Sequence, residues 1–395
     1  GATEWTLKNG VKVVVLPTQH KKDQVIFNLE WDGGKTLIAT EDLPSFEDNI
    51  WGLYLGTTGV SKFSNTQLPK MLAGKRASAS PYISGYEHGI SGQSAPKDLE
   101  TAFQLAYLYY TAPRFDQEEY NVGMQQIKAV FPNIKNTPDY KYGVELEKVL
   151  YGNNPRVISL NDEVIAKANL ETIEKNYRRL FSGVDGATLL VIGNFDIESL
   201  KPLVEKYIGS IPANKKKITK RVDDGVDYAK GEVVNDFKAA MQQPKVSVCR
   251  YYTGDIEYNL ENAVTLSFLR DILRARYTIS IREEKGGTYG VGVSAAPIPR
   301  TKQYSLQVQF DTNEQMADEL MAIVVAELEK IAKEGPLKED MDKTREYENK
   351  NYTKSIEQNS WWSNAILYKY RYGIDYVKEY LDAVNSVTAA DVQAL

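Results

Sequence analysis

Alternating apolar and polar residues predict β-strands in this chain. In residues 303–310 every second side chain is apolar, from Tyr304 to Phe310, and the side chains between them are polar. Successive side chains of a strand point to opposite faces, so we expect a strand with one covered and one wetter face. A second strand is predicted just before it, over residues 289–296, and we expect the two to pair.

Short apolar runs predict the strands of the N-terminal half. The pair Asn9-Gly10 is typical of a two-residue turn, so the chain is expected to open with a hairpin. Later runs are bounded by glycine, asparagine or proline, which commonly mark strand ends. The other predicted strands cover residues 11–16, 25–31, 77–83, 86–92, 187–192, 232–237 and 245–251.

Helical spacing of apolar residues predicts helices between these strands. Two expected capping boxes mark helix starts, one at Asp116 with Glu119 and one at Thr312 with Gln315. Each would let a side chain accept a hydrogen bond from a backbone N–H that has no partner within the helix. Predicted helices include residues 43–55, 161–180, 197–208 and 260–282.

Both halves of the chain share one order of elements: strands, a helix, paired strands and then several helices. This order predicts two homologous α+β domains, each a mostly antiparallel sheet covered by helices. The predicted boundaries are 1–215 for the first domain, 216–231 for a linker rich in lysine and aspartate, and 232–395 for the second. The chain ends in a short helix, so we expect its C-terminus to be truncated.

Charge and hydropathy exclude two classes of partner. The 395 residues carry a net charge of −5, and no long basic run argues for nucleic-acid binding. No apolar run approaches the ~18 residues that a membrane span needs. We therefore expect neither nucleic acid nor a membrane span.

One segment holds candidate binding chemistry. Arg282 is predicted at the end of a long helix and Tyr289 at the start of a strand, with a Gly-Gly turn between them. A cation near a helix C-terminus complements the helix dipole, and aromatic residues are common in strands, so both could be purely structural. Alternatively, the turn lets a guanidinium and a phenol point into one cleft, where both can donate to peptide carbonyl oxygens.

Histidines are too few for a common kind of metal site. The sequence contains only His20 and His88, so no two histidines lie one helical turn apart. His20 is expected in a solvated loop beside two lysines. His88 is expected on a strand, in a structural or surface role.

Three motifs in order support a family resemblance. Residues 282–291, 186–196 and 207–212, together with the opening hairpin, resemble the pitrilysin-type zinc peptidases, which include insulin-degrading enzyme and mitochondrial processing peptidase. The resemblance spans nearly the whole chain. It implies a half clam shell of two α+β domains, which closes on a second half around a peptide. In that family one half carries a zinc motif, H-x-x-E-H, and the other half contributes an arginine and a tyrosine to substrate binding.

The chain departs from the family at the metal motif. Alignment on Gly56-Thr57 places Glu47, Ile50 and Trp51 where His, Glu and His would stand. Isoleucine and tryptophan cannot ligate zinc. We therefore expect no catalytic residue and no metal in this chain, with zinc held by the partner half.

The resemblance thus implies the inactive, substrate-binding half of a zinc metallopeptidase. Its expected partners are a peptide substrate and a zinc-bearing half, on the same polypeptide or in a separate subunit. The expected substrate-binding residues are Arg282 and Tyr289. The alternative is a stand-alone scaffold or peptide-binding module with the same fold. The resemblance also suggests the bacterial periplasm or cell envelope.

Overall fold

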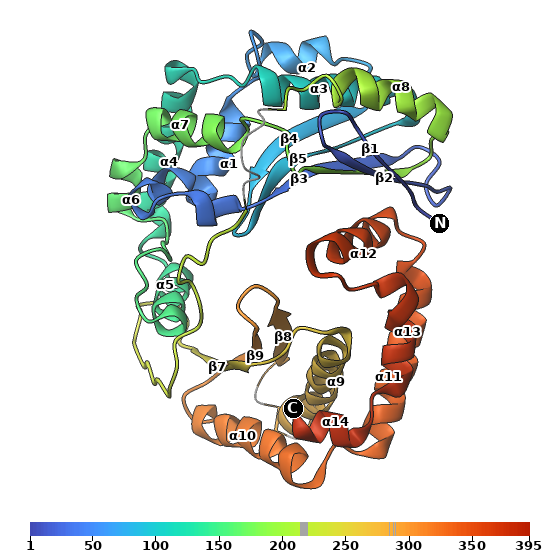
Figure 1. Cartoon of the computed structure of the whole chain (residues 1–395). Helices are drawn as coiled ribbons and strands as arrows, with labels where there is room; N and C mark the ends of the chain where they lie inside the picture. Colours follow the sequence, from blue (N-terminus) through green and yellow to red (C-terminus); the bar gives the residue numbers. More distant parts are fainter. Residues whose placement is uncertain (214–219, 284, 287, 289) are drawn as a thin grey trace. The chain divides into compact units, whose positions relative to one another are not determined.

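The chain consists of two compact units, each with its own hydrophobic core. The structure, a computed structural model, describes all residues except 214–219, 284, 287 and 289 (Figure 1). Unit 1 comprises Gly1–Ala229 and Val233–Ala239, and unit 2 comprises Lys230–Glu232 and Ala240–Leu395. Each unit combines a β-sheet with helices, so the predicted α+β class is confirmed.

Unit 1 is built on a six-stranded sheet. In spatial order its strands are β1 (Thr3–Thr6), β2 (Lys12–Pro17), β6 (Thr188–Gly193), β3 (Val25–Asp32), β5 (Glu87–Ser94) and β4 (Ala77–Ile83). Its α-helices are α1 (Asp48–Thr57), α2 (Gln67–Met71), α3 (Leu99–Thr111), α4 (Gln117–Ile134), α5 (Pro138–Tyr151), α6 (Asp162–Lys167), α7 (Leu170–Leu180) and α8 (Ile197–Tyr207). Three short 3-10 helices are η1 (Gly34–Leu37), η2 (Thr40–Phe46) and η3 (Pro96–Asp98).

The opening hairpin is confirmed, and it leads into the centre of the sheet. Strands β1 and β2 pair antiparallel, with Gly10 in the left-handed conformation at the turn, φ 92°. The Asn9 side-chain amide donates to the carbonyl oxygens of Ile208 (2.8 Å) and Ile211 (3.0 Å), which ties the turn to the end of α8. Strand β2 then pairs parallel with β6, so the sheet is mixed; all its other neighbouring strands run antiparallel.

The two faces of this sheet differ in polarity. Helices α3 and α8 lie across one face (Figure 1), and Phe27 of β3 meets Phe103 of α3 there at 5.1 Å between ring centroids. On β3 the alternate residues Asn28 and Glu30 accept hydrogen bonds from the Tyr82 hydroxyl at 2.9 and 2.7 Å. The core of unit 1 therefore lies between the sheet and its helices.

Unit 2 has a smaller, three-stranded sheet and a different helix set. Its strands, in the order β7-β9-β8, are β7 (Val246–Asp255), β9 (Gln303–Thr312) and β8 (Gly292–Ile298), and all neighbours run antiparallel. Its helices are α9 (Leu260–Tyr277), the π-helix η4 (Thr278–Glu283), α10 (Ala317–Glu334), α11 (Lys338–Ser355), α12 (Asn359–Tyr372), α13 (Tyr376–Ser386) and α14 (Ala389–Ala394).

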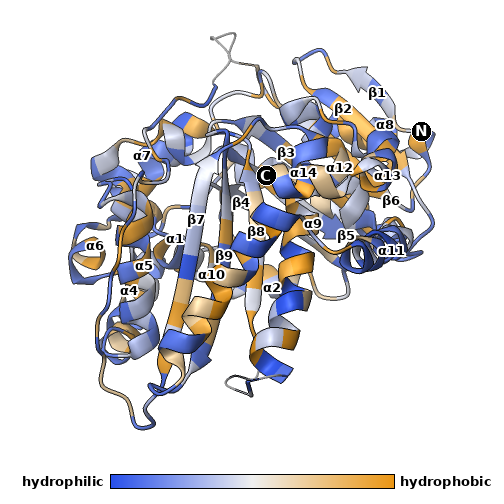
Figure 2. Ribbon diagram, turned by 90° about the horizontal axis from the view of Figure 1, so that it is seen from below, coloured by the Kyte–Doolittle hydropathy of each residue, from blue (hydrophilic) through white to orange (hydrophobic). Residues whose placement is uncertain are grey.

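The predicted pairing in unit 2 is confirmed. Strands β8 and β9 pair with Val293 opposite Val308. Along β9, Leu306, Val308 and Phe310 are buried and Gln309 is exposed, as the alternation predicted. Figure 2 shows α11 almost wholly in the hydrophilic colour. Its buried side chains are accordingly mostly polar, Asp340, Thr344 and Glu348 among them.

Three predicted elements were wrong. Residues 232–237 form no strand; their side chains are exposed, and no ladder in the described structure includes them. The helix predicted over 161–180 is two helices, because Asn169 leaves the helical conformation and its side chain caps α7. The capping box predicted at Thr312 is also absent. Thr312 remains in β9 opposite Val246, and the Asn313 side chain instead accepts from the Met316 N–H at 2.9 Å.

Most of the described part of the expected linker, residues 220–229, belongs to unit 1. The Arg221 guanidinium lies 3.1 Å from the Asp32 carboxylate. Further along, the Ala229 N–H donates to the Leu150 carbonyl at 2.7 Å, and the Tyr228 ring stacks on Tyr151. The chain is thus anchored along α5 before it enters unit 2.

Candidate functional site

Helix α1 carries the residues that align with the family's metal motif. Glu47 is its N-cap: the buried carboxylate accepts from the N–H groups of Asn49 (3.0 Å) and Ile50 (3.2 Å). The Asn49 side-chain amide donates to the other carboxylate oxygen at 2.7 Å. A carboxylate at this position satisfies otherwise unpaired N–H groups and complements the helix dipole. Glu47 therefore has a structural role at the start of α1.

Aromatic rings occupy the face of α1 that a metal would need. Ile50 and Trp51 are buried, and the Trp51 ring lies 5.7 Å from Phe46, 5.4 Å from Tyr54 and 6.4 Å from Tyr177 between centroids. Further edge and stacking contacts extend this packing. We call the whole set the aromatic cluster, consisting of Phe46, Trp51, Tyr54, Phe115, Tyr177 and Phe181.

These residues do not fit a zinc ion. Zinc in proteins is bound by cysteine, histidine and carboxylate side chains. At the aligned positions the structure offers a capping carboxylate, an aliphatic chain and an indole. Among the described residues, no group of three or more His, Cys, Asp or Glu side chains could hold a metal ion.

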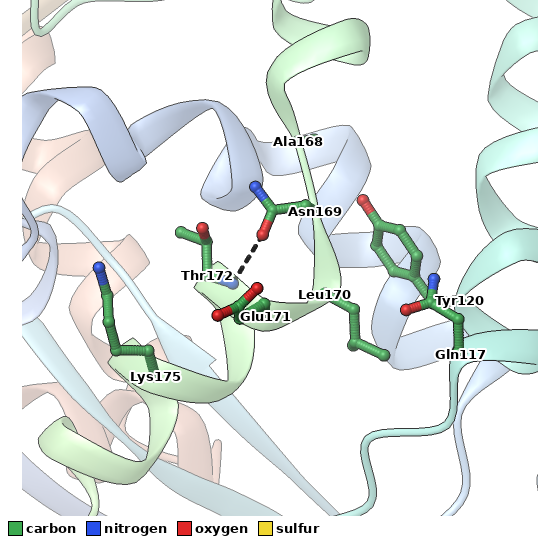
Figure 3. Close-up of a pocket in the computed structure, with 8 residues that line it drawn as sticks. All are labelled: Gln117, Tyr120, Ala168, Asn169, Leu170, Glu171, Thr172 and Lys175. Carbon is green, nitrogen blue, oxygen red and sulfur yellow. Dashed lines mark hydrogen bonds between the residues drawn. The ribbon is translucent and has the colours of Figure 1, made fainter.

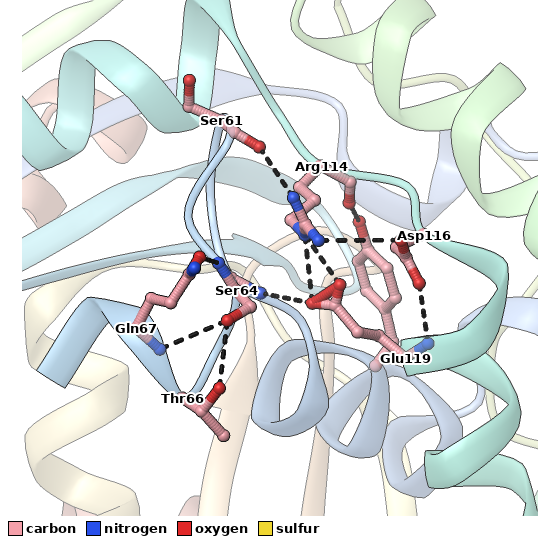
Figure 4. A network of polar contacts seen from close by, with 9 residues as sticks. Ser61, Ser64, Thr66, Gln67, Arg114, Asp116 and Glu119 are labelled. Atoms are coloured by element: carbon pink, nitrogen blue, oxygen red, sulfur yellow. Dashed lines mark hydrogen bonds and ion pairs between the residues drawn. The ribbon is translucent and has the colours of Figure 1, made fainter.

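A polar network fixes the other end of α1 (Figure 4). The Arg114 guanidinium pairs with Glu119 at 2.7 Å and donates to the Ser61 carbonyl at 3.3 Å. Glu119 accepts from the Gly59 N–H at 3.2 Å, and the Tyr54 hydroxyl donates to the Arg114 carbonyl at 2.7 Å. The loop after α1 is thus tied to the start of α4, and α1 is anchored at both ends.

His88 has a structural role, as expected. Its ring is fully buried; Nδ1 accepts from the Gly34 N–H at 3.1 Å, so Nε2 carries the proton and donates to the Leu180 carbonyl at 3.1 Å. The ring stacks on Trp31 at 5.7 Å. Burial lowers the pKa of His88 to about 4, so the ring is neutral near pH 7. His20 is exposed in a loop, also as expected.

Acid is therefore expected to destabilise unit 1 through His88. The folded-state pKa lies below the unfolded value of 6.5, so the contribution is complete above pH 6.5 and is lost as pH falls towards 4. Each unit of pKa shift corresponds to about 1.4 kcal/mol. His88→Gln offers one acceptor and one donor and does not titrate. Its urea midpoint should therefore vary less between pH 7 and pH 4.5 than that of the wild type; an equal decrease would contradict this role.

Arg282 lies at the end of a well-anchored helix. Helix α9 continues into the π-helix η4, a rare form that often occurs at functional sites. Ile281 is fully buried, whereas the neighbouring Arg282 is exposed, and its side chain makes no hydrogen bond or ion pair with another described residue. The Arg282 carbonyl accepts from the Gly286 N–H at 3.1 Å, and Gly286 has a left-handed φ of 62°. Tyr289 lies outside the described residues.

Three contacts hold the backbone that presents Arg282. The Arg274 guanidinium donates to the Val293 carbonyl at 2.8 Å, which joins α9 to β8. Arg276 pairs with Asp340 of α11 at 2.9 Å. The buried Tyr277 hydroxyl donates to the Val324 carbonyl of α10 at 2.8 Å. The backbone that presents the exposed Arg282 side chain is thus held by α10, α11 and β8.

Comparison with known proteins identifies part of the chain. A family model described as peptidase M16 inactive domain matches residues 167–347. This part of the chain, rather less than half of it, is therefore similar to the inactive domain of M16 peptidases. The matched residues include Arg282, and they end close to Glu348 of α11. The resemblance to zinc peptidases found in the sequence is thereby confirmed.

Similar proteins are longer than this chain. A protein of Arabidopsis thaliana named zinc protease PQQL-like is 23% identical over 388 residues, which are 94% of this chain and 38% of that protein. The crystal structure of the periplasmic protease PqqL from Escherichia coli matches with a TM-score of 0.85 and 18% identity, over 100% of this chain and 43% of PqqL. This chain thus spans less than half the length of these two relatives.

A half of PqqL also matches on its own. The crystal structure of the first half of that protease aligns with 100% of this chain and 88% of its own length, with a TM-score of 0.75 and 14% identity. At such identities the comparison shows a shared fold. The described residues contain no helix that is long and apolar enough to cross a membrane.

Proposed function

We propose that this chain is the non-catalytic, substrate-binding half of a pitrilysin-type zinc metallopeptidase. The observation that carries the proposal is the aromatic cluster around Trp51, a residue that the sequence alignment sets against the family's zinc motif. A chain with this packing cannot supply the metal, yet it keeps the fold of such peptidases. The zinc, and the water that it activates, would come from a second half.

The lengths of the similar proteins support a two-half enzyme. This chain aligns with 43% of PqqL, and the first half of PqqL alone also has its fold. We therefore propose that the two units of this chain are homologous domains, divided near the segment 216–231, and that they close on a zinc-bearing half. That half would lie on the same polypeptide or in a separate subunit. The PqqL structure is that of a periplasmic protease, and we propose the same compartment here.

Arg282 and Tyr289 are the residues that we propose to bind the peptide. Arg282 is exposed, available and fixed at its backbone, and a guanidinium can donate to carbonyl oxygens from several N–H groups. The glycine at 286 lets the loop turn back sharply. Tyr289 follows the pair Gly286-Gly287 in the sequence.

Substitution in the paired enzyme tests this role. With the zinc-bearing half present, Arg282→Ala is expected to lower kcat/KM for a peptide by about 10²-fold, the cost of losing one oriented donor. Tyr289→Phe should lower it less, because the ring remains. Lys330→Ala, which removes an exposed cation from α10, serves as the matched control and should leave turnover unchanged.

A lower kcat/KM reports on peptide binding only if the Arg282→Ala and Tyr289→Phe variants fold as the wild type does. Arg282 contacts no described side chain, so Arg282→Ala should unfold at the wild-type temperature. Unchanged turnover in both variants would exclude the binding role. It would favour the alternative, a scaffold or peptide-binding module that serves no active site.

A further inference from the structure

Unit 1 contains a cavity that the proposed function does not use. Its volume is about 640 Å³, within the usual range for ligand pockets. It lies between the first turn of α4, with Gln117 and Tyr120, and the first turns of α7, residues 168–172 and Lys175 (Figure 3). None of these residues belongs to the α1 site or to the segment around Arg282.

The start of α7 offers two backbone donors to this cavity. Asn169 caps the helix, and its side chain accepts from the Thr172 N–H at 2.8 Å. The Asn169 N–H donates to the Ser45 hydroxyl at 3.1 Å, which fixes the turn in place. The N–H groups of Leu170 and Glu171 occupy the first two positions of this eleven-residue helix and have no acceptor within it. Such N–H groups bind anions well.

A second observation at this cavity also points to a ligand. Tyr120 lines the cavity and is only 6% exposed, yet its hydroxyl has no hydrogen-bond partner among the described residues. Figure 3 shows the Tyr120 ring reaching from α4 towards the Asn169 turn, with its hydroxyl directed at that turn. A buried hydroxyl without a hydrogen-bond partner destabilises the fold. We therefore expect the Tyr120 hydroxyl to donate a hydrogen bond to a ligand in this cavity. Burial raises the pKa of Tyr120 to about 12, which keeps the hydroxyl a neutral donor.

The surrounding charges restrict the class of anion. The Lys175 ammonium already pairs with Asp42 at 3.0 Å, and the exposed Glu171 adds a carboxylate to the cavity wall. A doubly charged phosphate would therefore meet two carboxylates with only one cation beside it. A carboxylate carries a single charge, and its two oxygens can accept from several donors at once.

We propose that this cavity binds a carboxylate group. The N–H groups of Leu170 and Glu171 and the Tyr120 hydroxyl would donate to its oxygens. The carboxylate could belong to the C-terminus of a peptide or to a small free acid, and these share the same chemistry. The proposal does not depend on the proposed function, because it uses only residues of unit 1 and no catalysis.

Titration of the full chain with matched probes tests the site. The probes are N-acetyl-dialanine as the free acid, the same peptide as its C-terminal amide, acetate, and inorganic phosphate, each followed by calorimetry or by NMR shifts. We expect saturable binding of the acid and at least about 10-fold weaker binding of the amide and of phosphate. The amide loses the charge-assisted hydrogen bonds of the carboxylate, and the second charge of phosphate is repelled by the carboxylates nearby. Acetate binding as tightly as the peptide acid would assign the site to small acids; weaker acetate binding would assign it to peptide C-termini.

Substitution of the tyrosine provides the specific control. Tyr120→Phe should weaken binding of the acid about 5- to 10-fold, the effect of one hydrogen bond. Since the hydroxyl has no hydrogen-bond partner among the described residues, this variant should melt no lower than the wild type. Tyr347→Phe, an exposed tyrosine on α11, should bind normally. The proposal is overturned if the acid does not bind saturably, if the amide or phosphate binds equally well, or if Tyr120→Phe binds as the wild type does.

Discussion

Replacing Trp51 by alanine is expected to lower the free energy of unfolding of unit 1 by about 3–5 kcal/mol, the usual cost of truncating a buried large aromatic side chain. The ring is 8% exposed and lies within 6.4 Å of three other rings. Truncation would leave a cavity beside Phe46, Tyr54 and Tyr177, and α1 cannot move to fill it because both its ends are anchored. Urea unfolding followed by circular dichroism would measure the change.

Two further variants make this result specific. Trp51→Phe keeps a ring in the cluster and should restore part of the lost stability. Trp5→Ala removes a partly buried tryptophan from β1, the edge strand of the same sheet, and should cost less, about 1–2 kcal/mol. If Trp51→Ala and Trp5→Ala cost the same, the aromatic cluster does not hold α1, and the physical basis for excluding zinc there would be lost.

Replacing Glu348 by glutamine is expected to stabilise unit 2 at pH 8 and to remove much of its pH dependence. Glu348 of α11 is buried; it accepts from the Tyr380 hydroxyl of α13 at 3.0 Å and lies 3.8 Å from the Arg270 guanidinium of α9. Arg270 is closer to Asp271, at 2.9 Å, and Arg274 lies 3.8 Å from the same carboxylate. Burial and the neighbouring Asp271 raise the pKa of Glu348 to about 7.

The sign of the pH effect follows from this shift. The folded-state pKa lies above the unfolded value of 4.5, so the protonated carboxyl stabilises unit 2 fully below pH 4.5. That stability is lost as pH rises through 7, and we expect the loss to be about 1–3 kcal/mol. Glutamine is a neutral isostere that can still accept from Tyr380 and can donate to Asp271, so its contribution does not change with pH.

Hydrogen exchange in α9, α11 and α13 at pH 5 and pH 8 would measure this effect in unit 2 alone, after correction for intrinsic rates. The wild type should lose protection at pH 8 and Glu348→Gln should not. Glu346→Gln changes an exposed carboxylate on the same helix and should behave as the wild type. Equal protection of the wild type at both pH values would contradict the assignment. The response is opposite in sign to that of His88, which destabilises unit 1 in acid.

Local signals in the sequence predicted the regular elements well. The Asn9-Gly10 turn and the alternation along 303–310 each specify a structure within a few residues, and both are present. The strand predicted over 232–237 failed for the opposite reason. Two adjacent valines fit a strand, but a strand needs a partner, and in the described structure this segment lies along unit 1 without one.

The site was predicted by exclusion rather than by recognition. Two histidines far apart in sequence exclude H-x-x-E-H, and at the aligned positions the structure has a capping carboxylate, an aliphatic side chain and an indole. Phe46, Ile50, Trp51 and Tyr54 follow helical spacing, which could have indicated a buried face on this helix. Their contact with Tyr177 could not have been read from the sequence, because it joins residues more than a hundred positions apart.

The buried carboxylates of unit 2 were missed for a similar reason. Glu348 lies in a helix rich in charged residues, so its sequence context predicts an exposed side chain. Only the packing of α11 against α9 and α13 places it beside Asp271 and Tyr380. Arg282, in contrast, was identified by its place in a motif, and its role in binding remains a prediction.

The most direct test of the central claim is peptide turnover by this chain with and without the zinc-bearing half of the peptidase. We expect the chain alone to cleave no peptide in a chelator-sensitive manner, because Trp51 and its aromatic neighbours take the place that the sequence alignment predicts for the zinc motif. Addition of the chain to the zinc-bearing half should raise turnover at least about 10-fold, since bound substrate would then be oriented at the metal. Chelator-sensitive cleavage by the chain alone, or no increase on mixing, would contradict the account.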